Sequence, residues 1–310
     1  MINIGRLRLL YELSILGSIT AVAKAVHLTR PAVSQQLSLL EQELDVVLLQ
    51  KVGRNVELTP IALSLANRYP ELYSIINNIE SDLALTKEDK VGQIRISLFA
   101  SAAIGIMPLC ASLISKKYPL IELKINELEP DDGLKAVVAN QVDIALVDNM
   151  VDLKSFSMTL DFIPLCTDYF NVIASSQHFL ANHKIVNLKD LSNEKWVFNQ
   201  HAINYNTYIN NAFLAAGFKP NIIGNYKNST ASLELIKYNL ALSILPFLSI
   251  NHLSNDSNFT LVRIKPLMSR QIFIAVPKGR SKQPAINAII QTLQESVPNK
   301  LRRLDNSNIL

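Results

Sequence analysis

The segment 30–44 carries polar residues that could read DNA bases from one helical face: Arg30, Ser34 and Ser38, with Gln35 beside them. The opposite face is apolar at helical spacing, through Val33, Leu37, Leu40 and Leu44. Arginine and glutamine can each form two hydrogen bonds with a base edge, while serine is small enough to allow a close approach to the major groove. The pattern favours a DNA-reading helix over an ordinary polar helix face, which would not need such compact side chains.

A second basic feature follows this helix. Residues 48–58 form two short alternating runs around Gly53, which predicts a β-hairpin. Lys51 and Arg54 lie near its turn, where they could contact phosphates. Such contacts contribute affinity without sequence preference, so the hairpin is expected to act as a wing beside the reading helix.

The elements that position the reading helix lie before it in the chain. Residues 4–16 repeat apolar positions at helical spacing and stop at Gly17. Ser18 can cap a second helix over residues 19–26, and Thr29 can cap the helix that begins at Arg30, with Pro31 in its first turn. The first sixty residues therefore predict a winged helix-turn-helix.

Residues 59–90 predict a long linker helix, capped by Thr59 and begun by Pro60. Its apolar seam comprises Ile61, Leu65, Tyr69, Leu72, Ile76, Ile79 and Leu83. This near-heptad spacing favours pairing with a second chain, and the alternative is packing against the rest of the same chain. A homodimer would read a dyad-symmetric operator. Pro70 predicts a kink or a break in the seam.

From residue 92 onward, predicted strands alternate with helices, which is typical of a parallel α/β arrangement. Such sheets bind ligands beyond the carboxyl ends of their strands, where helix N-termini offer free N–H groups. Ser101, Asn228 and Ser229 follow predicted strands in this way. We therefore expect a small-molecule site in this half.

The stretch 28–37, together with Leu40-Glu41 and Leu58-Thr59-Pro60, resembles the DNA-binding segment of LysR-type transcription regulators. The phrases Ile106-Met107-Pro108, Val142-Asp143-Ile144-Ala145 and Ser243-Ile244-Leu245-Pro246 resemble landmarks of the effector domains of the same family. The resemblance implies a DNA-binding domain over 1–58, a linker helix over 59–90 and an effector-binding domain over 91–300. It also implies two lobes, formed by 92–165 plus 268–300 and by 166–267, that fold like periplasmic solute-binding proteins, and a C-terminal tail over 301–310. It implies double-stranded DNA, a small-molecule effector and further copies of the chain as partners, in a dimer or a tetramer made of two dimers.

The resemblance also assigns residues to the two sites. On the DNA side it implies contacts by Thr20, Thr29, Arg30, Ser34, Gln35 and Arg54, to which the helix and hairpin patterns add Ser38 and Lys51, while Pro31 and Ala32 shape the start of the helix. On the effector side, the resemblance and the strand ends together give Ser101, Ala102, Pro130, Asp131, Asp148, Asn199, Asn204, Tyr205, Asn228 and Ser229. Each effector-side residue could equally be a helix cap or a turn residue.

Asp148 departs from relatives that place an arginine near this point to hold an anionic effector. Glu129, Asp131 and Asp132 add further negative charge nearby. The sequence therefore favours an effector that carries an amine over a plain organic acid, unless these carboxylates are solvated loop residues.

Composition and the remaining residue types exclude several functions. The net charge is +4, and residues 1–58 hold nearly equal numbers of basic and acidic residues, so bulk charge does not indicate nucleic-acid binding. The five histidines and two cysteines show no metal-ligand spacing, and Ser101 lacks a nucleophile-elbow pattern, so no cofactor and no catalysis are expected. The N-terminus has no secretion signal and no long apolar run follows, which favours the cytoplasm without membrane contact. The alternative, a solute-binding protein without a DNA role, would lack the helix-turn-helix.

Overall fold

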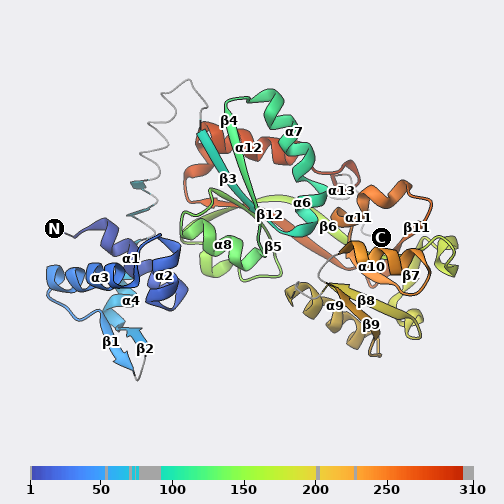
Figure 1. Cartoon of the computed structure of the whole chain (residues 1–310), viewed down its shortest axis with the longest axis horizontal. Coiled ribbons are helices and arrows are strands. Elements are labelled where there is room, and N and C mark those ends of the chain that lie inside the picture. The colour runs from blue at the N-terminus through green and yellow to red at the C-terminus, as the bar shows by residue number, and fades with distance from the viewer. Residues whose placement is uncertain are drawn as a thin grey trace.

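The computed structural model describes residues 2–52, 55–69, 72–73, 75–76, 92–199, 203–226 and 229–302. An N-terminal helical unit with a small hairpin lies at one end, and a larger α/β unit forms the rest of an elongated molecule (Figure 1). Among the described residues, no helix combines the length and the apolar character needed to cross a membrane.

The N-terminal unit is a winged helix-turn-helix. It consists of α1 (Ile4–Leu16), α2 (Ile19–Ala25), α3 (Arg30–Leu44), the antiparallel hairpin β1 (Leu49–Val52) and β2 (Asn55–Leu58), and α4 (Pro60–Ala66). Ser18, Thr29 and Thr59 each accept a hydrogen bond from a backbone N–H in the first turn of the helix that follows. The caps predicted from the sequence are therefore confirmed.

The core of this unit forms under α3. Val33, Leu37 and Leu40 are fully buried against α1 and α2, which leaves the polar stripe of α3 outside. Glu41 also fixes the start of the wing, because its carboxylate accepts hydrogen bonds from the backbone N–H groups of Leu48 and Leu49 at 2.8 and 3.0 Å. One helix thus positions both predicted DNA-contacting elements.

The connecting segment differs from one continuous helix. Helix α4 ends at Ala66, and residues 67–68 form a turn, so the helix is interrupted shortly before Pro70. Pro70 and the predicted seam residues Ile79 and Leu83 lie outside the described residues. Tyr69 is 5% exposed and packs on Tyr11, with ring centroids 5.4 Å apart. For Tyr69 the seam prediction is wrong, because the side chain is buried in the apolar core of its own chain, and Leu65 is partly buried against the same core.

The α/β unit is built on one large sheet with the order β4-β3-β5-β12-β6-β11-β7, with β10 paired to β6. Its first lobe contains β3 (Gly92–Leu98), α6 (Ala100–Gly105), α7 (Met107–Lys117), β4 (Ile121–Glu127), α8 (Pro130–Val138), β5 (Ile144–Asp148), β12 (Ser269–Pro277), α12 (Pro284–Glu295) and α13 (Asn299–Arg302). Its second lobe contains β7 (Ile185–Asn187), β8 (Lys195–Asn199), α9 (Ile203–Ala215), β9 (Asn221–Tyr226), α10 (Ser229–Lys237), β10 (Ser243–Pro246), α11 (Phe247–Ile250) and β11 (Phe259–Lys265). Strands β8 and β9 form a separate parallel pair.

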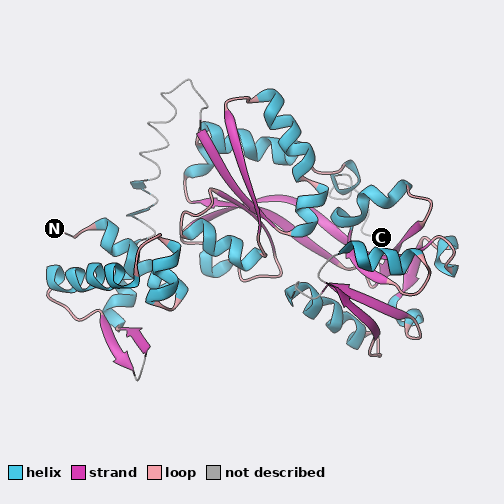
Figure 2. Cartoon of the chain, viewed as in Figure 1, coloured by secondary structure: helices cyan, strands magenta, loops and turns pink. Residues whose placement is uncertain are grey.

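The long strand β6 (Leu160–Ser175) belongs to both lobes. Its first part pairs with β12, and its last part pairs with β10 and β11 (Figure 2). The register between β6 and β12 shifts at Ile272 and Phe273, close to Cys166. Each lobe has its own apolar core, and Leu248 of α11 is buried in the core of lobe one, so the lobes meet across β6, across α11 and across the space beside them.

Candidate functional site

The polar face of α3 is available for contact with DNA. Arg30, Gln35 and Ser38 are exposed, and Ser34 is half-buried between them. Among the described residues, Arg30 and Gln35 have no hydrogen-bonding or ion-pairing side chain as a partner, whereas the neighbouring Gln36 accepts a hydrogen bond from Arg6 at 2.9 Å. The side chains predicted to read bases are thus the ones that the fold leaves unengaged.

The other predicted DNA contacts surround this stripe or lie outside the described residues. Thr20, Thr29 and Pro31 are exposed, and the hydroxyl of Thr29 caps α3 by accepting from Ala32 N at 3.3 Å. Arg54 and the side chain of Lys51 lie outside the described residues. The α3 stripe is therefore the part of the predicted surface that the structure describes.

A cavity of about 580 Å³ lies between the two lobes. Lobe one contributes residues from α6, from the end of β4, from the start of α8 and from the end of β5, while lobe two contributes residues from α9, α10, β10 and α11. Its volume falls within the range usual for small-molecule sites, roughly 300 to 1,000 Å³. The cleft expected beyond the strand ends is therefore present.

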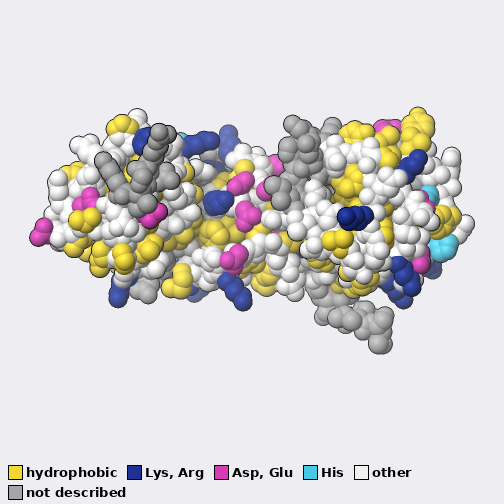
Figure 3. All heavy atoms as spheres, turned by 90° about the horizontal axis from the view of Figure 1, so that it is seen from below, with side chains coloured by type: hydrophobic (Ala, Val, Ile, Leu, Met, Phe, Trp, Pro, Cys, Tyr) yellow, Lys and Arg dark blue, Asp and Glu magenta, His cyan; other side chains and the backbone are white. Residues whose placement is uncertain are grey.

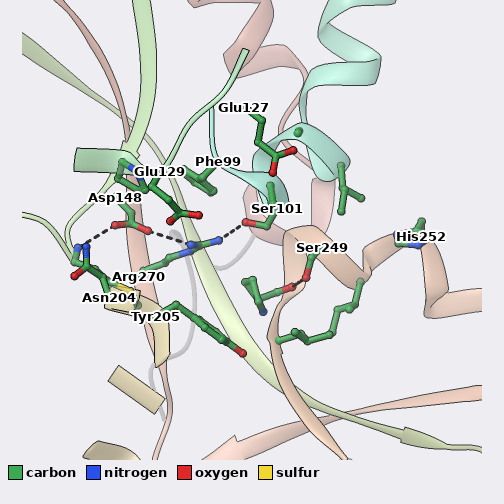
Figure 4. Close-up of a pocket in the computed structure, with 18 of the residues that line it drawn as sticks. Phe99, Ser101, Glu127, Glu129, Asp148, Asn204, Tyr205, Ser249, His252 and Arg270 are labelled. Atoms are coloured by element: carbon green, nitrogen blue, oxygen red, sulfur yellow. Dashed lines mark hydrogen bonds and ion pairs between the residues drawn. The ribbon is translucent and has the colours of Figure 1, made fainter. Parts of the chain in front are cut away.

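Arg270 lies at the centre of the cleft wall (Figure 4). Its guanidinium donates to Asp148 and to Asp168, each at 3.0 Å, and to the hydroxyl of Ser101. The group lies over the ring of Phe99, 4.6 Å from the centroid, and is only 6% exposed. Two buried carboxylates, an aromatic face and a hydroxyl thus already satisfy this arginine within the chain.

Two further carboxylates face the cavity without such a partner. Glu127 and Glu129 line it and form no ion pair with any described residue. Burial raises the pKa of Glu129, and the negative charges of Asp148 and Glu127 raise it further. The cleft therefore carries an excess of negative charge over the single arginine.

The structure brings together half of the predicted effector residues. Ser101, Pro130, Asp148, Asn204 and Tyr205 line the cavity. The hydroxyl of Tyr205 is used internally, because it donates to the carbonyl of Ile244, and burial raises its pKa above the usual value.

The remaining predicted residues are placed differently. Ala102 is fully buried and does not line the cavity, because α6 turns its neighbours Ser101 and Ala103 toward it instead. Asp131 accepts a hydrogen bond from Asn204 at 3.0 Å and so links α8 to lobe two. Asn228 and the side chains of Asn199 and Ser229 lie outside the described residues.

The sequence interpretation misses Arg270, Phe99, Glu127 and Ser249 as lining residues. The signal for Arg270 is a charged residue in the polar start of β12, ahead of its apolar run, matched by Asp168 in the strand that pairs with it. The prediction of Asp148 as a free carboxylate for an amine is wrong, because Arg270 holds it. Within the described ranges, no three His, Cys, Asp or Glu side chains gather in a metal-binding group.

Comparisons with known proteins agree with both halves of the structure. The family described as "Bacterial regulatory helix-turn-helix protein, lysR family" matches residues 4–63, and the "LysR substrate binding domain" matches residues 87–298. An uncharacterized HTH-type transcriptional regulator of Bacillus subtilis, YvbU, is 26% identical over 294 residues, which cover 94% of this chain and 98% of that protein.

Solved structures share the fold at low sequence identity. A full-length variant of OxyR from Pseudomonas aeruginosa aligns with a TM-score of 0.66 and 15% identity, covering 95% of each chain. Full-length CbnR in complex with its target DNA aligns with a TM-score of 0.53 and 17% identity, covering 95% of this chain and 99% of that chain. A helix-turn-helix with an open polar stripe is thus joined to a two-lobed unit with a cavity, and both units match their family over nearly the whole chain. The chain belongs to the LysR family of transcription regulators, which bind DNA and respond to a small-molecule effector.

Proposed function

We propose that the chain reads a dyad-symmetric operator with two copies of α3 and that an amine-bearing effector in the cleft sets its response. Arg30, Ser34 and Gln35 would contact base edges, with Thr20, Thr29 and Ser38 beside them and the wing residues Lys51 and Arg54 on phosphates. The exposure of the α3 stripe and its lack of internal partners support this assignment. Because DNA is the target, we place the protein in the cytoplasm, and we assign it no catalytic role.

Exposed apolar side chains support a dimer. Residues at the start of the connecting segment leave a large share of their surface open: Ile61, Leu63, Leu72 and Ile75 are 38–57% exposed. Figure 3 shows hydrophobic side chains gathered on the surface of this end of the molecule. Large apolar patches of this kind mark interaction surfaces, so we propose that they pair two chains and that two such dimers can form a tetramer.

One observation carries the proposal on the effector. Among the described residues that line the cleft, the only basic side chains are Arg270 and His252. Arg270 is already paired with Asp148 and Asp168. It therefore offers little to an anionic ligand, whose carboxylate would also meet Glu127 and Glu129. An ammonium group placed near those two carboxylates would offset their repulsion. The proposal of an amine-bearing effector therefore rests on the carboxylates of Glu127 and Glu129, and not on Asp148.

Ligands of matched length test this proposal by thermal shift and calorimetry. Pentane-1,5-diamine, 5-aminopentanoate and glutarate differ only by the exchange of an amine for a carboxylate. A ligand at a hundred times its Kd stabilises the fold by about 2.7 kcal/mol, which raises Tm by a few degrees. We expect the diamine and the amino acid to stabilise the chain, and tight binding of glutarate alone would contradict the proposal.

Two variants and the pH dependence of ligand affinity test whether Glu129 is the partner of the amine. Glu129→Gln should weaken amine binding, while Glu122→Gln, which changes an exposed carboxylate at the far end of β4, should not. A bound ammonium stabilises the ionised form of Glu129, whose pKa is raised in the free protein, so affinity should increase as the pH rises through that pKa. Affinity that is independent of pH in the wild type would argue against Glu129 as the partner.

A further inference from the structure

The DNA-binding unit lies against lobe one of its own chain, next to the C-terminal end of α8 (Figure 1). Four hydrogen bonds cross this contact, three with the DNA-binding unit and one with Tyr73 of the connecting segment: Arg8 Nη2 to Ala139 O at 3.1 Å, Tyr11 Oη to Thr159 Oγ1 at 3.2 Å, Gln141 Nε2 to Ala25 O at 3.2 Å, and Tyr73 Oη to Asn140 Oδ1 at 2.7 Å. We call residues 138–141 together with Thr159 the docking surface.

Apolar packing adds to these hydrogen bonds. Val138 packs against both the core of the DNA-binding unit and a core cluster of lobe one. On the other side, Tyr11 and Tyr69 are each 5% exposed, and Tyr73 stacks on Tyr69 with ring centroids 5.6 Å apart. The contact therefore combines a shared apolar centre with hydrogen bonds around it, as in a specific interface.

The opposite end of α8 belongs to the effector cleft. Glu129 and Pro130 line the cavity at the start of the helix, and Asp131 accepts the hydrogen bond from Asn204 of lobe two. The helix has nine residues, so its two ends are separated by about 13 Å. Leu134 and Val137 are buried against the sheet between them. One short helix thus contacts the cleft at one end and the DNA-binding unit at the other.

We propose that the docking surface holds the DNA-binding unit of the same chain and that α8 couples this contact to the state of the cleft. The proposal rests on the proposed function, because it requires that the cleft binds the effector and that α3 binds DNA. When lobe two closes, Asn204 and the ligand act on the start of α8, and a helix displaced along its axis carries Ala139, Asn140 and Gln141 with it. Hydrogen bonds of 2.7–3.2 Å tolerate shifts of only a few tenths of an ångström, so a shift of about 1 Å would release them. Cleft closure would then free the DNA-binding unit from a fixed position relative to lobe one.

A disulfide that locks the cleft tests the coupling without knowledge of the effector. In the full-length chain, Asp131→Cys and Asn204→Cys place two thiols where the side chains now form a hydrogen bond, and Cys110 and Cys166 are buried and do not compete. Thiol titration verifies the oxidised form. We expect the Kd for DNA upstream of the chain's own gene to differ at least fivefold between the oxidised and the reduced form, measured by gel shift.

Variants of the docking surface provide the matched comparison. Tyr11→Phe, Tyr73→Phe and Gln141→Ala together remove three of the four hydrogen bonds, and each loss weakens docking about fivefold, or roughly a hundredfold in combination. In this background the effect of the disulfide on DNA affinity should disappear. Tyr238→Phe removes the hydroxyl of a tyrosine that is 71% exposed on lobe two, so the effect should persist there. An effect of equal size in all three backgrounds, or no effect in any of them, would overturn the coupling.

A distance measurement tests the docking itself and is independent of DNA. Spin labels at Gln42→Cys and Ser112→Cys, both on exposed positions, report the separation of the two units when labelled chains are diluted with unlabelled ones. We expect one narrow distance in the wild type and a second, longer population in the triple variant. A broad distribution in the wild type would overturn the docking. If no form of the chain binds DNA, the proposed function fails, and this measurement still decides whether the docking surface is occupied.

Discussion

The buried ion pairs of Arg270 give a sharp test of how the cleft wall is held together. Arg270, Asp148 and Asp168 are 6%, 2% and 0% exposed, and the two ion pairs are 3.0 Å long. Arg270→Met keeps most of the side-chain volume but leaves two carboxylates buried without their cation. The removal of one partner from a buried pair costs about 3 to 5 kcal/mol, so we expect a loss of that size in the free energy of unfolding.

Urea denaturation of the full chain, followed by circular dichroism, measures this loss. Arg95→Met is the matched control, because Arg95 pairs with Asp143 at 3.0 Å while its side chain is 37% exposed, and it should cost about 1 kcal/mol or less. In Arg270→Met, Asp168 loses the positive charge that lowers its pKa, so burial raises this pKa further. A carboxyl group whose pKa is higher in the folded state than in the unfolded state stabilises the fold at low pH, and this contribution is lost as the pH rises. The loss in the free energy of unfolding of Arg270→Met should therefore be larger at pH 8 than at pH 5. Equal losses in Arg270→Met and Arg95→Met, with no dependence on pH, would refute the reasoning.

Other substitutions test the remaining features. Gln35→Ala should relax sequence preference by about 1 to 3 kcal/mol for one base pair, whereas Arg54→Ala should weaken binding to all DNA and reduce its salt dependence, and gel shifts on operator and unrelated DNA separate these outcomes. Equal, sequence-independent losses in both variants would contradict the assignment of α3. Burial raises the pKa of Cys110 to about 12, so its thiol should remain unreactive toward a thiol reagent at pH 8 until urea unfolds the chain; rapid labelling of the native protein would show that this site opens. Gly105→Ala would push a methyl group into the backbone carbonyl of Leu248 and should cost about 1 to 3 kcal/mol in urea unfolding, and an unchanged midpoint would mean that α6 and α11 can separate freely.

The DNA-reading half could be predicted in detail because its signals are local. Caps at Ser18, Thr29 and Thr59 fix where helices begin, and the four-three-four spacing of apolar residues in 30–44 fixes which face is free. Each of these signals lies within a few residues of the feature that it determines. The seam was less predictable, because Tyr69 can pack equally well on a second chain or on Tyr11, and only the path of the chain after Ala66 decides between them.

The cleft could be located from the ends of strands but not described in its chemistry. Asp148 and Arg270 are 122 residues apart in the sequence, and Asp168 and Arg270 are 102 apart. Spacing along the chain carries no information about such pairs, which form only when β12 returns to lie between β5 and β6. The relatives place an arginine near position 148, whereas in this chain the arginine of the cleft is Arg270, which is already paired with Asp148 and Asp168.

The position of β12 in the sheet also has a consequence during synthesis. The DNA-binding unit is complete within its first seventy residues or so, and much of lobe two is contiguous in the chain, but β5 and β6 have no strand between them until residues 269–277 emerge from the ribosome. Nascent chains therefore carry a finished DNA-reading unit well before the lobe against which it docks. A chain that ends before residue 269 would contain the helix-turn-helix but lack β12, the strand that lies between β5 and β6, so it would carry a DNA-reading unit without a complete sensor.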